Sequence, residues 1–157
     1  MTTKPAVDAP GVIAFPPLLL LATVATGVAA HLLSPVPLPV AWAWRLAGVL
    51  SGAAGLAIVL WARAQMVRAG TNVRPDKPST AIVTTGPYRF TRNPMYLSLC
   101  LLNLGIAFGI GDLVPALLTL PLAVVLHVGV ILREERYLRG KFGETYSAYC
   151  RQVRRWL

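Results

Sequence analysis

The sequence predicts an all-α membrane protein with about four transmembrane helices and a C-terminal amphipathic helix in the membrane interface. Fifty-five per cent of the 157 residues are hydrophobic, only 13% are charged, and the mean hydropathy is +0.60. Soluble domains carry about 25% charged residues. Several apolar runs approach the roughly 20 residues that a helix needs to cross a bilayer. A chain of this length has room for a single domain, residues 1–157.

Two long apolar runs come first in the chain and two shorter ones follow. The four predicted spans lie at about 12–33, 40–62, 94–110 and 113–132. Small residues crowd the second span between Gly48 and Gly55. They let a neighbouring helix approach closely, so we expect tight helix packing there.

The net charge of +9 is concentrated in two segments. Six of the fifteen Lys and Arg residues lie in 63–92 and seven lie in 133–155. Basic residues in alternate connections follow the positive-inside rule, which predicts that these segments and both termini are cytoplasmic, at the inner membrane if the protein is bacterial. The same residues suit a surface of anionic membrane lipids. No nucleic-acid motif accompanies them, so we expect no nucleic-acid partner.

The first polar cluster is GPYRFTRNPMY, residues 86–96. Pro94 suits the first turn of the third span, with Asn93 as its N-cap, and the free N–H groups there favour an anion. The side chains expected at this helix mouth are Tyr88, Arg89, Arg92 and Asn93, with Tyr96 one turn deeper. The β-branched stretch 81–85 before the cluster is expected to be extended. An anchor of aromatic and arginine side chains in the headgroups explains the cluster equally well.

The second polar cluster begins with adjacent acids at the end of the fourth span. Glu134 and Glu135 lie where a helix C-terminus and nearby hydrocarbon disfavour negative charge. Arg139, four residues on, explains Glu135. Glu134 has no basic residue three or four positions away, so it needs a cation from outside its own helix. That cation could be Arg89 or Arg92, or it could be part of a ligand. His127 lies two turns earlier on the same face, where a satisfied interior histidine is the simpler interpretation.

The segment after the glutamates has aromatic and aliphatic residues at near-helical spacing. These residues are Leu138, Phe142, Tyr146 and Tyr149. The pattern predicts a helix in the membrane interface, and the same helix could also cover a site between the spans. The two cysteines lack metal-ligand spacing, so no metal is expected.

Together, GPYRFTRNPMY and the tail REERYLRGKFGETYSAYCRQVRRWL, some forty residues later, resemble the isoprenylcysteine carboxyl methyltransferase family. They are also similar to the wider group of membrane methyltransferases that includes phospholipid N-methyltransferases. The resemblance covers about residues 71–157. It implies S-adenosylmethionine held at the cytoplasmic side, between the Arg-x-Pro-x-Tyr segment and the glutamate pair. It also implies a lipid-like acceptor.

The resemblance carries over to individual residues. The family's Arg-His-Pro-x-Tyr motif is matched by Arg92, Pro94 and Tyr96, with Asn93 in place of the histidine. The candidate catalytic residues are Arg92, Glu134 and Glu135. The candidate cofactor-binding residues are Gly86, Tyr88, Arg89, Asn93, Pro94, Tyr96, His127 and Glu134.

The predicted acceptor is a carboxylate, because the amide of Asn93 cannot take up a proton and a carboxylate is already ionised at pH 7. A phospholipid amine, which must first lose a proton, is the alternative. Two other hypotheses stay open. One is a non-catalytic four-helix membrane subunit. The other is an NADPH-dependent reductase of the sterol type, because sterol reductases end in an aromatic and basic tail similar to this one. The sequence does not predict the oligomeric state.

Overall fold

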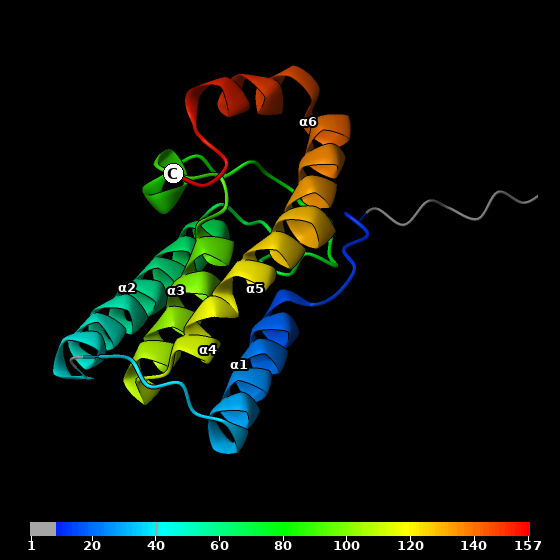
Figure 1. The fold of residues 1–157 in the computed structure, drawn as a ribbon. Coiled ribbons are helices and arrows are strands. Elements are labelled where there is room, and N and C mark those ends of the chain that lie inside the picture. Colours follow the sequence, from blue (N-terminus) through cyan, green and yellow to red (C-terminus); the bar gives the residue numbers. More distant parts are fainter. Residues whose placement is uncertain (1–8, 40) are drawn as a thin grey trace, which may run out of the picture.

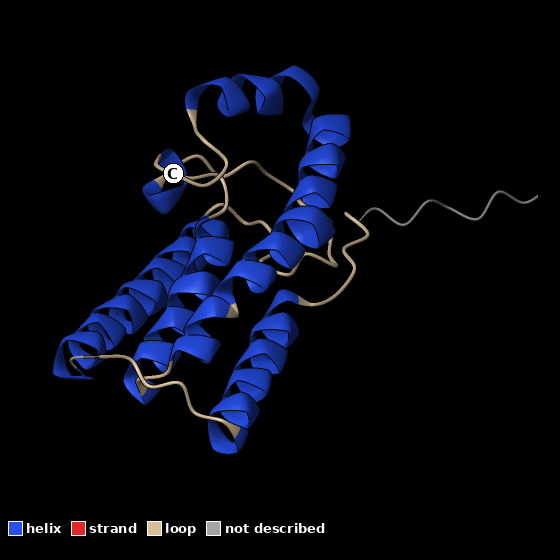
Figure 2. Ribbon diagram, viewed as in Figure 1, coloured by secondary structure: helices blue, strands red, loops and turns tan. Residues whose placement is uncertain are grey.

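A computed structural model describes residues 9–39 and 41–157. Within these residues the helices pack into a bundle, and no β-strand is present (Figures 1 and 2). The all-α prediction is confirmed. The elements are α1 (Pro16–Leu33), α2 (Ala41–Arg68), the 3-10 turn η1 (Gly86–Arg89), α3 (Pro94–Ile110), α4 (Leu113–Leu117), α5 (Thr119–Leu126), the π-helical turn η2 (His127–Ile131) and α6 (Leu132–Gln152).

Three helical stretches among the described residues are long and apolar enough to cross a membrane. They are Pro16–Leu33, Trp42–Arg68 and Leu113–Gln152. The predicted third span corresponds to α3, a shorter apolar helix with the predicted bounds. Pro94 begins this helix, and Gly111 ends it with a φ of 77°, a conformation that favours glycine.

The other spans differ from the prediction at their ends or in their interior. The first helix begins at Pro16 rather than at residue 12, because two prolines occupy its first turn. The predicted fourth span is divided into α4, α5 and η2. Pro121 lacks the N–H that would bond to the carbonyl of Leu117, the residue at which α4 ends.

Helices α2 and α3 pack backbone against backbone through glycines. A Cβ atom added to Gly48 would lie 2.8 Å from the backbone nitrogen of Gly109. A Cβ atom added to Gly105 would lie 2.8 Å from the Cα atom of Gly52. Real Cβ atoms do not approach other atoms so closely, so only glycine permits this spacing. The expected tight packing of the second span is confirmed.

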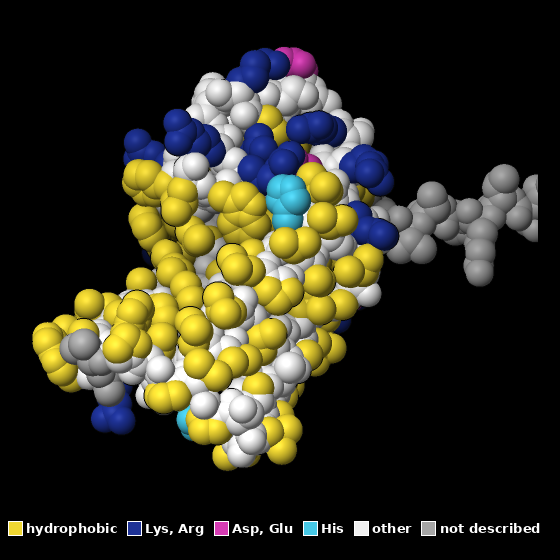
Figure 3. Space-filling model, in the orientation of Figure 1, with side chains coloured by type: hydrophobic (Ala, Val, Ile, Leu, Met, Phe, Trp, Pro, Cys, Tyr) yellow, Lys and Arg dark blue, Asp and Glu magenta, His cyan; other side chains and the backbone are white. Residues whose placement is uncertain are grey.

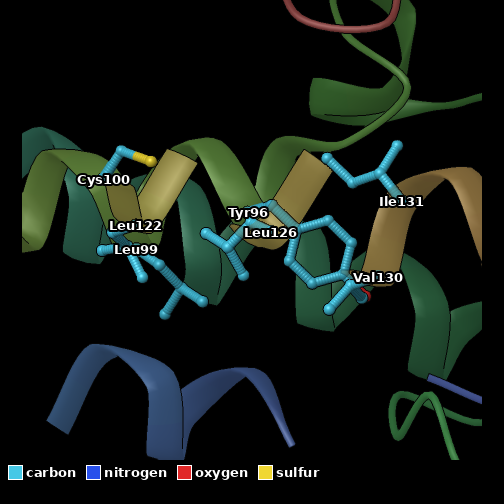
Figure 4. Packing of buried hydrophobic residues seen from close by; sticks show 7 residues of the cluster. All are labelled: Tyr96, Leu99, Cys100, Leu122, Leu126, Val130 and Ile131. Atoms are coloured by element: carbon cyan, nitrogen blue, oxygen red, sulfur yellow. The ribbon is translucent and has the colours of Figure 1, made fainter. Parts of the chain in front are cut away.

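A buried apolar cluster joins α3 to the chain's last long helical stretch (Figure 4). Its members are Tyr96, Leu99 and Cys100 from α3, with Leu122, Leu126, Val130 and Ile131 from α5 and η2. This packing fixes the first turn of α3 beside the beginning of α6, so that the two polar clusters of the sequence meet.

Helix α6 bends at Gly143, whose φ of 53° is in the left-handed region that favours glycine. The part after the bend lies across the end of the bundle, and the C-terminus returns beside η1 (Figure 1). Lys and Arg side chains gather at this end in the view of Figure 3, whereas hydrophobic side chains cover most of the rest of that face. We call it the basic end.

Candidate functional site

A cavity at the basic end is formed by the loop between α2 and η1, the start of α3, and α6. Its polar lining residues are Asn72, Arg74, Ser79, Tyr88, Arg92, Asn93, Tyr96, Glu134, Glu135, Tyr146 and Tyr149. Apolar side chains such as Met66, Met95 and Leu138 complete the wall. The cavity therefore combines the two polar clusters that the sequence singled out.

Glu134 is a half-buried carboxylate on this cavity. Its Oε1 atom accepts a hydrogen bond of 2.6 Å from the Tyr96 hydroxyl. No cationic side chain among the described residues pairs with it. The expectation that Arg89 or Arg92 neutralises Glu134 is wrong, because Arg92 is committed to Glu135 and Arg89 is exposed.

Glu135 is only 4% exposed, and arginines fill both of its oxygens. Arg155 donates from Nε to Oε1 at 2.9 Å and from Nη2 to Oε2 at 2.8 Å, and Arg92 Nη2 donates to Oε1 at 3.0 Å. The predicted pair with Arg139 is confirmed, but at 3.7 Å it is the longest contact. The hydrogen bond with Glu135 also raises the pKa of Arg155. Glu135 is thus fully paired within the chain.

Arg92 is nine-tenths buried and holds together three parts of the site. One terminal nitrogen bonds Glu135, and the other, Nη1, donates to the Cys150 carbonyl at 3.1 Å. The Nε atom of Arg92 is buried and has no hydrogen-bond partner among the described residues. A buried donor without a partner is costly, so this N–H is available to a ligand.

Asn93 occupies the predicted N-cap position of α3, but its side chain makes no capping bond. Instead, Nδ2 donates to the carbonyl of Arg155 at 2.9 Å, and the backbone N–H donates to Thr91 Oγ1 at 3.2 Å. The expected cap is wrong because the returning C-terminal tail offers a carbonyl within reach of the amide. Asn93 therefore ties the tail to the cavity wall.

Tyrosines form a neutral aromatic wall. Tyr88 is 9% exposed, and its carbonyl accepts a 2.7 Å hydrogen bond from the Tyr149 hydroxyl. Burial raises the pKa of Tyr88, so its hydroxyl stays protonated at neutral pH. The rings of Tyr146 and Tyr149 lie 6.1 Å apart. The part of α6 after the bend thus covers the cavity.

Three of the predicted site residues lie outside the cavity lining. Gly86 packs η1 against α2, since a Cβ atom there would lie 2.6 Å from Gln65 Cγ. Arg89 is exposed. His127 pairs with Trp156 through a 3.3 Å contact between Nδ1 and the indole N–H, which matches the interpretation of a satisfied histidine.

Sequence reasoning did not select several residues that complete the site. Arg155, Tyr146 and Tyr149 come from the tail, where a basic and aromatic pattern is equally typical of a membrane anchor. The expected extended stretch forms no strand in the described residues, and its first three residues, 81–83, line the cavity as part of a loop. No pattern in the sequence singled out Arg155, because Arg139 at helical spacing already accounted for the charge of Glu135.

Comparison with known proteins agrees with this architecture. The phospholipid methyltransferase family matches residues 44–145, which include most of the cavity lining. An uncharacterized protein of Haemophilus influenzae is 41% identical over 63 residues, which are 40% of this chain and the whole of that relative. No solved structure matches significantly. With its apolar spans and a family match over well over half of its length, this chain is an integral membrane protein that belongs to the phospholipid methyltransferase family.

Proposed function

We propose that the protein transfers a methyl group from S-adenosylmethionine to a lipid-like acceptor, with the donor bound in the cavity at the basic end. One observation carries the proposal. Glu134 is a carboxylate on the cavity whose hydrogen-bond partner in the described chain is the neutral hydroxyl of Tyr96. A carboxylate beside a membrane span is energetically costly unless a positive group pairs with it.

The lining residues suit the charges of S-adenosylmethionine, which has a sulfonium, an ammonium and a carboxylate. Glu134 would hold one of the positive groups. The unpartnered Nε of Arg92 would donate to the carboxylate in a charge-assisted hydrogen bond. The tyrosine faces of the wall would stabilise a cation lying against them.

The space enclosed at present is small. Its volume is about 110 Å³, whereas sites for ligands of this size are about 300–1,000 Å³. The loop 72–83 forms one side of the cavity, and a long hydrogen bond of 3.3 Å joins its Ser79 N–H to the Tyr137 hydroxyl of α6. We expect this loop to move outward when the donor binds.

When bound, S-adenosylmethionine supplies an electrophilic methyl carbon, and its bond to sulfur breaks as a lone pair of the acceptor forms the new bond. The chain's own residues contribute position and exclusion of water. Glu134, Tyr96 and Arg92 would orient the donor, and Tyr146 and Tyr149 would shield it. For a displacement along one line, positioning accounts for most of the rate.

We propose a carboxylate as the acceptor, because the described residues of the lining include no free base. Glu135 is occupied by arginines, Glu134 is assigned to the donor, and the Asn93 amide cannot take up a proton. An ionised carboxylate needs no base. The family match favours a second candidate, the amine of a phospholipid.

We also propose that the basic end is cytoplasmic. The proposal rests on the distribution of Lys and Arg, which gather in the segments that build this end. Attachment of a membrane-impermeant thiol reagent to Cys150, which is half-buried beside the cavity, would test it. Labelling from the cytoplasmic side of sealed vesicles is expected, and labelling from the opposite side only would contradict it.

Donor binding tests the activity. Detergent-purified protein is titrated with S-adenosylmethionine and, separately, with NADPH. We expect micromolar binding of the first ligand, lost in Glu134→Gln and kept in Glu144→Gln, which removes an exposed carboxylate outside the cavity. Binding of NADPH alone would favour a reductase, and binding of neither would favour a non-catalytic subunit.

The acceptor is identified from the chemistry of its product. Protein in detergent is incubated with a bacterial lipid extract and donor labelled in the methyl group. Label that becomes volatile methanol on mild base treatment indicates a methyl ester and a carboxylate acceptor. Label that stays with an amine headgroup indicates the second candidate and contradicts the first.

A further inference from the structure

We infer that Arg155 is a positioning residue of the donor site, because it occupies Glu135 and thereby keeps one N–H of Arg92 free for the donor's carboxylate. The inference rests on the proposed function and extends it to the C-terminal tail. It concerns a side chain that lies outside the residues matched by the family, 44–145.

The tail is fixed to the cavity wall through its backbone. The N–H of Arg92 donates to the Arg154 carbonyl at 2.9 Å. The carbonyl of Arg155 accepts from Thr91 Oγ1 at 3.1 Å and from Asn93 Nδ2 at 2.9 Å. Since these three donors are consecutive in the chain, they hold the backbone of Arg155 in one place beside the start of α3.

The side chain of Arg155 then binds Glu135 with a fork of two N–H groups. Its Nε and Nη2 atoms reach different carboxylate oxygens, at 2.9 and 2.8 Å. Arg92 reaches the same carboxylate through a single nitrogen, at 3.0 Å. Arg155 therefore holds the two-pronged position, which is the favoured geometry of a guanidinium with a carboxylate.

Removal of this fork would change the partner of Arg92. Glu135 is 4% exposed, so its freed Oε2 atom needs a new donor, and neighbouring guanidiniums are at hand. Arg139 lies 3.7 Å from Oε2, but its side chain is 55% exposed and already solvated, so it gains less by moving in. Arg92 is the buried guanidinium already in contact, and its Nε is the donor without a partner. A two-pronged pair between Arg92 and Glu135 would consume that Nε. The donor's carboxylate would then lose its hydrogen bond.

The test compares donor affinity with stability. Arg155→Gln is expected to raise the Kd and the KM for S-adenosylmethionine about tenfold, with kcat changed by less than about threefold. Arg155→Lys keeps the charge and the docking of the tail but lacks the fork, so it should weaken donor binding in the same direction even if the glutamine variant folds poorly. Arg136→Gln, which removes an exposed charge from α6 outside the cavity, is the matched control.

A double-mutant cycle separates this role from a merely structural one. In an Arg92→Lys background no Nε remains to be consumed, so Arg155→Gln should weaken donor binding no further. A tail that only stabilises the fold would give the same loss in both backgrounds. That result, or an unchanged donor Kd in both Arg155 variants, overturns the inference while the proposed function stands. Failure of the wild-type protein to bind the donor overturns the proposed function itself.

Discussion

Each end of the bundle holds a carboxylate that is at least half-buried, but the two carboxylates differ in how many hydrogen bonds the chain donates to them. At the end opposite the basic one, Asp112 lies 2.8 Å from His31 Nδ1 and accepts from the N–H groups of Val36 and Val114 at 2.9 and 2.8 Å. At the basic end, Glu134 accepts one hydrogen bond within the described part of the chain, from Tyr96. A carboxylate whose oxygens already accept several hydrogen bonds from the chain has few lone pairs left for a ligand. Glu134 keeps free lone pairs, and it faces a cavity.

Glu135 sharpens this contrast because it is next to Glu134 in the chain. Its two oxygens are taken by Arg155 and Arg92, so it resembles Asp112 in being filled. Proximity to the cavity alone therefore does not distinguish a binding carboxylate from a structural one. What distinguishes them is whether neighbouring residues supply the counter-charge.

The largest expected effect is on stability, from Glu135→Gln. The change leaves the buried Arg92 and the half-buried Arg155 without their counter-ion. Loss of one partner of a buried ion pair costs about 3 kcal/mol, at the lower end of the usual range because Arg155 is partly exposed. Denaturation of the detergent-solubilised protein would measure the fall in the free energy of unfolding, with Glu144→Gln as the control. Wild-type stability in Glu135→Gln would remove the distinction between the two glutamates.

Glu134→Gln is expected to have the opposite profile. The amide oxygen still accepts the bond from Tyr96, and no charge has to be desolvated, so the midpoint of unfolding should stay the same or rise. Donor affinity should fall about 100-fold, which corresponds to about 2.7 kcal/mol. Calorimetric titration and thermal unfolding of one preparation measure both quantities. A variant that loses stability but still binds the donor would show that Glu134 is structural.

The part of the site that depends on local patterns was predictable from the sequence. Proline at the first helical position and glycine just after the last one set the bounds of α3. The absence of any basic residue at helical spacing from Glu134 correctly indicated an acid that its own helix does not neutralise. Its meeting with Tyr96 follows because both clusters flank spans that pack together.

The remainder of the site depends on how distant segments return, which spacing cannot specify. The sequence alone allowed Arg92 to pair with either of the two adjacent glutamates. In the structure it pairs with Glu135, which Arg155 of the C-terminal tail also binds. The π-helical turn η2 begins at His127 and ends at Ile131, three residues before Glu134. Bonds from i to i+5 change the residues per turn, so α-helical spacing does not align these two side chains on one face.

The smallest expected effect comes from the opposite end and tests whether Asp112 is purely structural. Asp112→Asn should lower the unfolding midpoint by a few degrees and leave donor affinity unchanged.

The stabilising effect of Asp112 should also depend on pH. The hydrogen bond with His31 lowers the pKa of Asp112 in the folded protein. A carboxyl whose folded pKa lies below its unfolded value of about 3.9 stabilises the fold above that value, and the contribution is lost as the pH falls through the folded pKa. The difference in midpoint between wild type and Asp112→Asn should therefore be largest near neutral pH and should shrink below about pH 4. A difference that stays constant with pH would mean that the ionised form of Asp112 does not carry the stability, and a loss of donor affinity would mean that the two ends of the bundle are coupled.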